Sequence, residues 1–316
     1  MFTLRQLRYI VAVGDTLSFR QAAEICHVSQ PTLSVQVQEV ENFLGVQLFE
    51  RNRRSVVLTP LGREIVERAK VVLREADEIV DLSRSARKPL SGPLRLGVIA
   101  TLGPYLLPYV LSAFRQEHPD LRLYLREDPS RRLERRLKEG ELDLILVDLP
   151  VDMQGLQSMD LFLEPLWLAA PRSHPLAQRD HVSPEDLAGG ELLLLEEGHC
   201  LRDEVLELCQ KVGAMEHGGF QATSLDTLRQ MVASNIGLTL LPDLYVAAEA
   251  AQDTQIRVIP FHPPQPTRTV SLIWRQNSAR AKEFQEFGAF ILERLPASLE
   301  RLPARSAAKP ERLDCP

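Results

Sequence analysis

Residues 18–44 read SFRQAAEICHVSQPTLSVQVQEVENFL, and this stretch predicts two short helices joined by a tight turn. Ser18 is a good cap for the first helix, in which the small side chains of Ala22 and Ala23 permit close packing. Ser29 is a good cap for the second helix, and Pro31 is tolerated in its first turn. One apolar stripe runs along the second helix at Leu33, Val37, Val40 and Leu44. Two helices joined by a turn of about three or four residues form the helix-turn-helix motif.

The second helix of such a motif enters the major groove of DNA with its N-terminus first. Hydroxyl and amide side chains on the face away from the apolar stripe can read base edges or bind phosphates. The residues expected to contact DNA from this helix are Ser29, Gln30, Pro31, Thr32, Ser34 and Gln38. We interpret the turn residues Cys26 and His27 as packing groups and not as metal ligands.

Residues 48–58, LFERNRRSVVL, predict a small β-hairpin wing with Arg51, Arg53 and Arg54 near its tip. A run of charge is by itself usually a solvated surface. Next to a helix-turn-helix, contact with phosphates or the minor groove is the favoured interpretation. Residues 1–88 carry 13 Lys and Arg against 11 Asp and Glu, which leaves 24 against 32 for the rest of the chain. This mild basic excess is compatible with an N-terminal DNA-binding domain but does not by itself require one.

Thr59 and Pro60 predict the start of a long helix, because the pair supplies a cap and a first-turn proline. Apolar residues then recur at helical spacing as far as Val80, over about 25 residues or about 38 Å. A single copy cannot hide this stripe from water. We therefore expect a homodimer, which also places two DNA-reading helices on a two-fold-related site.

Beyond a proline-containing linker, short apolar strands alternate with helical segments, which predicts an α/β fold with parallel sheets. The expected strands are 94–99, 121–125, 142–147, 192–195, 238–241 and 270–274. Ligands of such sheets bind beyond the carboxyl ends of the strands. Thr101, Ser130 and Cys200 each follow a strand, so the three side chains could meet in one pocket. As isolated residues, Thr101 and Ser130 are more simply explained as helix caps.

Residues 198–209, GHCLRDEVLELC, place two of the four cysteines nine positions apart. Cys200 is expected near a helix start, where the helix dipole, His199 and Arg202 would favour its thiolate. If the helix continues through Cys209, the two thiols lie about 13 Å apart along the axis, on nearly opposite faces. A disulfide between them would require the helix to come apart, which suits a redox switch. Spacing alone favours the simpler interpretation of two ordinary buried cysteines, and it matches no structural zinc site.

The composition is that of an ordinary globular protein: 316 residues, a net charge of −6, 44% hydrophobic and 25% charged. No apolar run suggests an export signal or a membrane span, so the expected location is cytoplasmic, where a disulfide would be transient. No nucleophile elbow or phosphate loop indicates an enzyme, and no cofactor or metal is expected. The tail from Pro296 is expected to be disordered.

Several motifs together resemble the LysR-type transcriptional regulators over residues 3 to about 295. They are residues 22–23, 28–34 (VSQPTLS), 48–51 (LFER) and 58–62 (LTPLG). Three further segments resemble the peroxide-sensing members of that family: residues 101–108, residues 198–209 and residues 222–229. The resemblance makes the redox interpretation of the cysteine pair the favoured one.

The resemblance implies that hydrogen peroxide oxidises Cys200 to a sulfenic acid and that Cys209 resolves it as a reversible intramolecular disulfide. It implies a peroxide pocket formed by Thr101, Ser130, His199, Arg202 and Asp203. Ser130 stands where we expect the family to have threonine, which keeps the hydroxyl and loses a methyl group. The implied partners are promoter DNA of antioxidant genes, RNA polymerase, a cellular thiol reductant and further copies of the chain as a homotetramer.

The implied fold has a winged helix-turn-helix and a regulatory domain of two Rossmann-like subdomains, as in periplasmic binding proteins. The expected boundaries are 1–59 for the DNA-binding domain, 60–88 for the dimerisation helix, 89–92 for a hinge, 93–163 with 267–295 for subdomain I, 164–266 for subdomain II and 296–316 for the tail. Other functions stay open. The pocket could bind a small-molecule effector, or the chain could be a thiol peroxidase or a DNA-binding protein without signal input.

Overall fold

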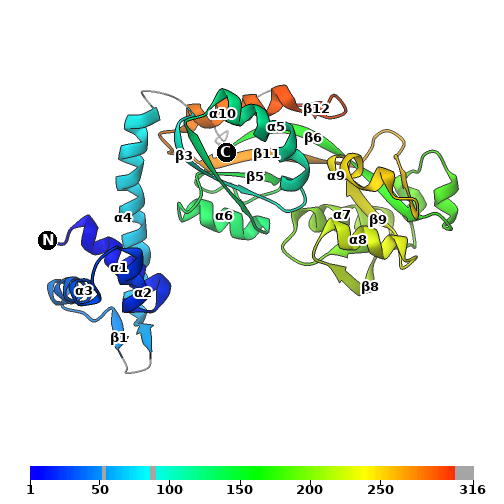
Figure 1. Ribbon diagram of the computed structural model, residues 1–316. Helices are drawn as coiled ribbons and strands as arrows, with labels where there is room; N and C mark the ends of the chain where they lie inside the picture. Colours follow the sequence, from blue (N-terminus) through cyan, green and yellow to red (C-terminus); the bar gives the residue numbers. More distant parts are fainter. Residues whose placement is uncertain (52–54, 86–89, 303–316) are drawn as a thin grey trace, which may run out of the picture. The chain divides into compact units, whose positions relative to one another are not determined.

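The computed structural model describes residues 1–51, 55–85 and 90–302, and the chain forms two compact units, residues 1–86 and 87–316. In the first unit, α1 to α3 and a hairpin lie beside the first half of the long helix α4 (Figure 1). The elements of this unit are α1 (Leu4–Thr16), α2 (Phe19–Ile25), α3 (Gln30–Leu44), β1 (Phe49–Arg51), β2 (Val56–Leu58) and α4 (Pro60–Ser85).

The helix-turn-helix forms as the sequence predicts. Ser18 Oγ accepts a hydrogen bond from the backbone N–H of Gln21, and Ser29 Oγ accepts one from that of Thr32, so both expected caps are confirmed. At the start of α4, Thr59 Oγ1 accepts from the backbone N–H of Gly62 at 2.8 Å. The apolar stripe of α3 packs into one core with α1, α2 and the first half of α4.

In its described residues, 90–302, the second unit contains an eight-stranded mixed sheet and a two-stranded parallel sheet, β7–β8. The strand order along the larger sheet is β10-β6-β11-β5-β3-β4, with β9 and β12 also paired to β6. Its strands are β3 (Gly92–Val98), β4 (Leu121–Glu127), β5 (Leu144–Asp148), β6 (Leu156–Pro171), β9 (Thr239–Pro242), β10 (Ile256–Ile259), β11 (Thr267–Arg275) and β12 (Glu300–Arg301). The smaller sheet contains β7 (Glu191–Leu195) and β8 (Met215–Ala222).

Between residues 90 and 302, the structure describes six α-helices and three short 3-10 helices. The α-helices are α5 (Gly103–Glu117), α6 (Ser130–Lys138), α7 (Cys200–Val212), α8 (Leu225–Ala233), α9 (Asp243–Ala248) and α10 (Ala281–Arg294). The 3-10 helices are η1 (Pro175–Gln178), η2 (Pro184–Leu187) and η3 (Ala250–Gln252).

The prediction of parallel sheets is confirmed for β3–β4, β3–β5 and β7–β8 and wrong for the other strands. In the larger sheet, β3 pairs in parallel with β4 and β5, whereas β6 and β11 are antiparallel to their neighbours. The physical reason is that β6 runs from the first apolar core, which contains Phe162, into the second, which contains Leu166, and β11 returns the chain to the first core at Val270. A chain that passes from one core to the other and returns must run in opposite directions.

The expectation of a disordered tail from Pro296 is wrong for its first residues. Leu299 is buried, β12 pairs with β6, and Ser298 Oγ donates to Asp243 at 3.1 Å. Apolar and hydrogen-bonded contacts therefore hold residues 296–302, and the rest of the tail lies outside the described residues. Among the residues that the structure describes, no helix combines the length and apolar character needed to cross a membrane.

Candidate functional site

A short turn carries the chain from β7 to the start of α7. Gly198 has φ of +99°, a conformation that glycine adopts without a steric penalty. His199 follows as the N-cap with an extended backbone, and Cys200 is the first residue of the helix. Both of these side chains are buried, each with 7% of its surface exposed. The predicted helix start at Cys200 is confirmed.

The two cysteines of the pair are free thiols on one unbroken helix. Nine residues of α-helix separate them by about 13 Å along the axis and turn their side chains to opposite faces. Cys209 is buried in the apolar core with Leu201 and Val205. Because a disulfide requires Cα atoms within about 7 Å, the bond can form only after α7 unwinds.

Ser130 reaches the start of α7 from another element. It is the first residue of α6, and the N-cap of that helix is Pro129. The explanation of Ser130 as a cap is therefore wrong, because its hydroxyl turns across the site and donates to the carbonyl of Gly198 at 3.3 Å. The same hydroxyl hydrogen-bonds the Cys200 thiol, which on its own lowers the pKa of the thiol.

Thr101 is not a helix cap either, since Leu102 is the N-cap of α5. Its Oγ1 accepts from Arg268 Nη1 at 3.0 Å, and its carbonyl accepts from Arg268 Nη2 at 3.0 Å. Arg268 also pairs with Glu164 at 2.7 Å and with Asp148 at 3.3 Å, and all three charged side chains are completely buried. These contacts join β5, β6 and β11 to the end of β3.

Sequence reasoning missed Asp148, Glu164 and Arg268. Each is a charged residue within or at the end of a strand that contains buried apolar residues, a position where burial demands a partner. That pattern was the available signal. The partners are distant in the chain, so the sequence did not show which charges meet.

The surroundings of Cys200 favour the protonated thiol over the thiolate. Burial raises its pKa well above the ordinary value, and the negative charge of Asp148 raises it further. His199 does not counter this effect, because burial lowers the pKa of its imidazole and favours the neutral ring. The expectation that a partly cationic setting favours the thiolate is therefore wrong for the reduced protein.

Arg202 and Asp203, the other two residues expected in the pocket, point elsewhere. Arg202 donates to the Leu195 carbonyl at 2.9 Å and to both carboxylate oxygens of Glu216 at 2.8 Å each. Asp203 is exposed. The structure thus brings Ser130 and Cys200 together with His199 and the Thr101–Arg268 cluster close by, while Arg202 ties the first turn of α7 to β8.

The DNA-reading face predicted on α3 is open to solvent at most positions. Gln30, Pro31, Thr32 and Gln38 are exposed, whereas Ser34 is half-buried. The Ser29 hydroxyl is occupied as the helix cap and also contacts the Thr32 hydroxyl at 2.7 Å. The wing forms as the predicted antiparallel hairpin of β1 and β2. Arg53, Arg54 and the side chain of Arg51 lie outside the described residues.

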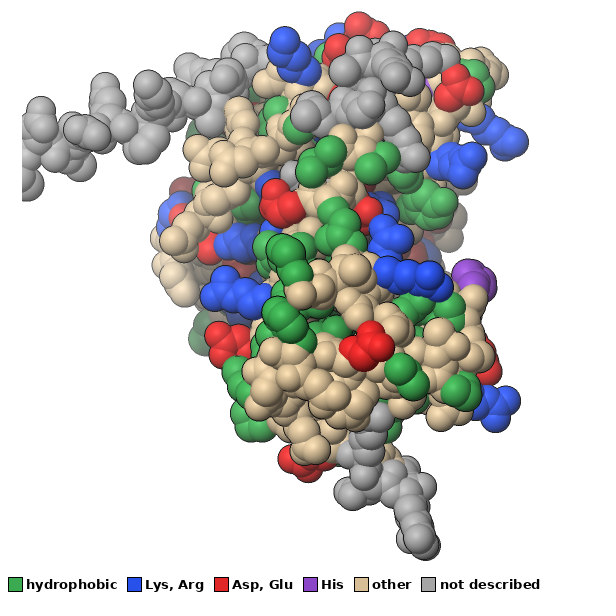
Figure 2. All heavy atoms as spheres, turned by 90° about the vertical axis from the view of Figure 1, so that its left-hand side faces the viewer, with side chains coloured by type: hydrophobic (Ala, Val, Ile, Leu, Met, Phe, Trp, Pro, Cys, Tyr) green, Lys and Arg blue, Asp and Glu red, His purple; other side chains and the backbone are tan. Residues whose placement is uncertain are grey.

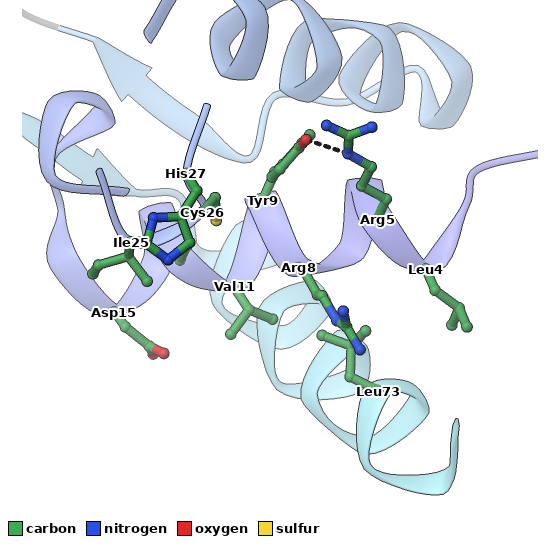
Figure 3. Close-up of a pocket in the computed structure, with 11 residues that line it drawn as sticks. Leu4, Arg5, Arg8, Tyr9, Val11, Asp15, Ile25, Cys26, His27 and Leu73 are labelled. Carbon is green, nitrogen blue, oxygen red and sulfur yellow. Dashed lines mark hydrogen bonds between the residues drawn. The ribbon is translucent and has the colours of Figure 1, made fainter. Parts of the chain in front are cut away.

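A groove of about 780 Å³ lies in the first unit between α1, the α2–α3 turn and α4. Figure 3 shows Arg8 of α1 extending toward Leu73 of α4, with Cys26 and His27 at the other end. Burial raises the pKa of the Cys26 thiol. No group of three or more potential metal ligands occurs among the described residues.

Comparisons with known proteins agree with this architecture. Residues 4–63 match the family described as "Bacterial regulatory helix-turn-helix protein, lysR family", and residues 87–296 match "LysR substrate binding domain". The chain is 40% identical to the "DNA-binding transcriptional dual regulator OxyR" of Escherichia coli K12 over 299 residues, which cover 95% of this chain and 98% of that protein.

Two solved structures extend the similarity. A full-length Cys-to-Asp variant of Pseudomonas aeruginosa OxyR matches with a TM-score of 0.78 at 38% identity, covering 96% of this chain and 99% of that chain. A Cys-to-Ser variant of Corynebacterium glutamicum OxyR with bound H2O2 matches with a TM-score of 0.65 at 32% identity, covering 93% and 92%. With an N-terminal helix-turn-helix and a C-terminal α/β regulatory domain, the chain belongs to the LysR family of bacterial transcriptional regulators.

Proposed function

We propose that this chain is a transcriptional regulator that senses hydrogen peroxide through Cys200 and Cys209. The observation that carries the proposal is the position of Cys200: a buried thiol at the first residue of α7, beside the Ser130 hydroxyl, with a second thiol on the same helix. The similarity to OxyR proteins, one of which is described with bound H2O2, supports peroxide as the signal.

The proposed chemistry has two balanced steps. The Cys200 thiolate attacks one oxygen of H2O2, the O–O bond breaks, and hydroxide leaves and takes a proton to form water. The product is a sulfenic acid on Cys200. Cys209 then attacks that sulfur, a second water leaves, and the disulfide forms. Hydroxyl donors such as Ser130 and Thr101 would orient the peroxide, with His199 as a neutral hydrogen-bonding group.

The second step supplies the conformational signal. Because Cys209 must leave the apolar core to reach Cys200, the disulfide form cannot keep α7 as it is in the thiol form. We propose that this remodelling changes the contacts between subunits and thus the spacing of their DNA-reading helices. A cellular thiol reductant would reset the switch in the cytoplasm.

The first unit offers a surface for the proposed dimer. Leu61, Val72, Ile79 and Val80 of α4 are exposed in the single chain. On the face drawn in Figure 2, hydrophobic side chains lie among basic and acidic ones. A second copy of α4 would cover this stripe and present two helix-turn-helix units to promoter DNA. A homotetramer on antioxidant promoters and contact with RNA polymerase complete the proposal.

The test is mass spectrometry of rapidly trapped thiols after one equivalent of H2O2. Selective linkage of Cys200 to Cys209, with Cys26 and Cys315 free, is the expected result. In Cys209→Ser, the sulfenic acid on Cys200 should accumulate instead. Absence of selective oxidation would overturn the proposed sensing chemistry.

A second candidate function is response to a small-molecule effector. It is favoured by a groove of about 330 Å³ between α7 and residues 264–267, lined in part by Glu204, Glu207, Lys211 and Gln265. A Cys200→Ser, Cys209→Ser double variant that still changes transcription in response to a metabolite would select this alternative.

A further inference from the structure

We propose that the groove of about 330 Å³ beside α7 binds a small organic ammonium ion, whose charged end pairs with Glu204. The bound cation spans α7 and residues 264–267, holds α7 in its helical form and slows formation of the disulfide. The effect on the disulfide rests on the proposed function, because Cys200 and Cys209 supply the two sulfurs. The binding site does not depend on that function.

Two parts of the chain form the walls of the groove. One wall is a face of α7 that includes Glu204, Glu207 and Lys211, which follow one another at intervals of three and four residues. The other wall includes residues 264–267, the segment that leads into β11. A ligand in this groove therefore contacts both the helix that carries the cysteines and a segment outside it.

Glu204 supplies the groove with an unused hydrogen-bonding atom. Its Oε2 is buried and has no hydrogen-bond partner among the residues that the structure describes. A buried carboxyl oxygen without a partner is costly, so it favours a ligand that brings a donor. Lys211, the basic residue of the groove wall, already pairs with Glu207 at 2.7 Å. Glu204 is thus matched best by a donor that also carries positive charge.

The rest of the groove suits a short apolar body. Leu166 is buried and Leu208 partly buried, and both line the groove. Pro264 and Pro266 line the opposite wall, and a proline has no backbone N–H to offer a ligand. The volume of about 330 Å³ lies at the small end of the range of small-molecule pockets, about 300 to 1,000 Å³. These features together select a primary amine with a short aliphatic chain.

Binding exchanges a proton for the cation. In the unliganded protein, burial raises the pKa of Glu204 to about 9, so its carboxyl group is protonated at pH 7. Among the neighbouring charges, Asp148, Glu164 and Glu207 raise this pKa further and Arg268 lowers it. An ammonium ion in the groove lowers it again, so one proton leaves as the ligand binds. Affinity therefore rises with pH between 7 and 9, where an amine like that of lysine, with an ordinary pKa of about 10.4, stays charged.

The ligand opposes the remodelling of α7 because it binds the helical form. The disulfide requires α7 to unwind so that Cys209 can leave the apolar core. Glu204 lies between Cys200 and Cys209 in the sequence, within the part of the helix that must unwind. A ligand that binds one conformation and not the other stabilises the first. Formation of the sulfenic acid needs no unwinding, so that step is not slowed.

The test is isothermal titration calorimetry of the full chain with n-butylammonium chloride at constant chloride concentration, in two buffers of different ionisation enthalpy. Millimolar binding with release of close to one proton at pH 7 is the expected result. The Kd should fall about tenfold from pH 7 to pH 8. n-Butanol, which has the same body and no charge, should bind at least about tenfold more weakly. No binding of the ammonium ion, or binding without proton release, would overturn the inference.

Glu204→Gln keeps the shape of the side chain and removes its charge, so at pH 8 it should weaken binding at least about tenfold and abolish proton release. Thermal unfolding verifies that the variant is folded. The matched control is Glu185→Gln, which removes an exposed carboxylate of η2 outside the groove and should change the Kd less than about twofold. Unchanged binding in folded Glu204→Gln would place the ligand elsewhere and overturn the inference.

Stopped-flow trapping of the sulfenic acid measures the effect on the switch. At four times its Kd, n-butylammonium should slow disulfide formation about fivefold and leave sulfenic acid formation within about twofold. An unchanged disulfide rate at that occupancy would overturn the proposed hold on α7. If H2O2 oxidises neither cysteine while calorimetry shows proton-linked binding, the proposed sensing function fails and the ammonium site stands.

Discussion

The guanidinium of Arg268 and the carboxylate of Glu164 lie 2.7 Å apart, and neither side chain is exposed to solvent. The pair joins β11 to β6 at the point where the chain passes between the two apolar cores of the second unit. The second oxygen of Glu164 accepts from the backbone N–H of Leu244 at 2.9 Å. One buried cation thus organises the same region that places Thr101 and Asp148 near Cys200.

Arg268→Met should destabilise the protein by about 3 to 5 kcal/mol, because it leaves Glu164 and Asp148 buried without their cation. Urea denaturation measures the loss. The matched control is Arg257→Met, which breaks an exposed pair with Asp180 at 3.1 Å and should cost less than about 1 kcal/mol. Equal losses in the two variants would show that the buried cluster contributes no more than a surface pair.

Glu216→Gln should speed disulfide formation about fivefold once Cys200 is a sulfenic acid. The bidentate Arg202–Glu216 pair holds the first turn of α7 to β8, and weakening it by about 1 kcal/mol lowers the cost of unwinding the helix. Stopped-flow trapping of the sulfenic acid gives the rate. In Glu207→Gln, which removes an exposed pair with Lys211 on the same helix, the rate should change less. A wild-type rate in Glu216→Gln would mean that Arg202 stays bound during the remodelling.

Glu204 should make the protein less stable as the pH rises. Burial raises its pKa to about 9, from an ordinary value of about 4.3, so the folded chain holds a proton that the unfolded chain releases. The resulting stabilisation is complete below about pH 4.3 and is lost as the pH rises through about 9, at up to about 1.4 kcal/mol per pH unit. Urea denaturation between pH 6 and 9 should show a shallower decline in Glu204→Gln. Parallel declines in the two proteins would contradict a protonated Glu204.

Gln30→Ala should weaken binding to a specific promoter by about 1 to 3 kcal/mol, because Gln30 is an exposed amide in the first turn of α3. Amide contacts to bases release no counterions, so the salt dependence of binding should stay the same. Fluorescence anisotropy at several salt concentrations separates the two effects. Gln154→Ala, an exposed amide in the regulatory unit, serves as the control and should bind like wild type.

The sequence by itself determined the features that depend on neighbours along the chain. Helical spacing predicted α2, α3 and the long helix α4, and the caps at Ser18, Ser29 and Thr59 lie where the hydroxyl residues predicted them. These contacts join residues three or four positions apart, so their partners are visible in the sequence. For the same reason, the helix start at Cys200 and its separation from Cys209 followed from spacing alone.

Only the tertiary structure decided the environment of the thiol. Arg268 contacts Glu164, which is 104 residues away in the sequence, and Asp148, which is 120 residues away. Local residue spacing cannot predict either contact. The Ser130 hydroxyl, which could have capped its own helix, instead reaches Gly198 across 68 positions. Whether a cysteine at a helix start favours its thiolate depends on the sum of burial and nearby charge, and distant strands supply both. The fold therefore raises the pKa of a thiol for which the sequence predicted a favoured thiolate.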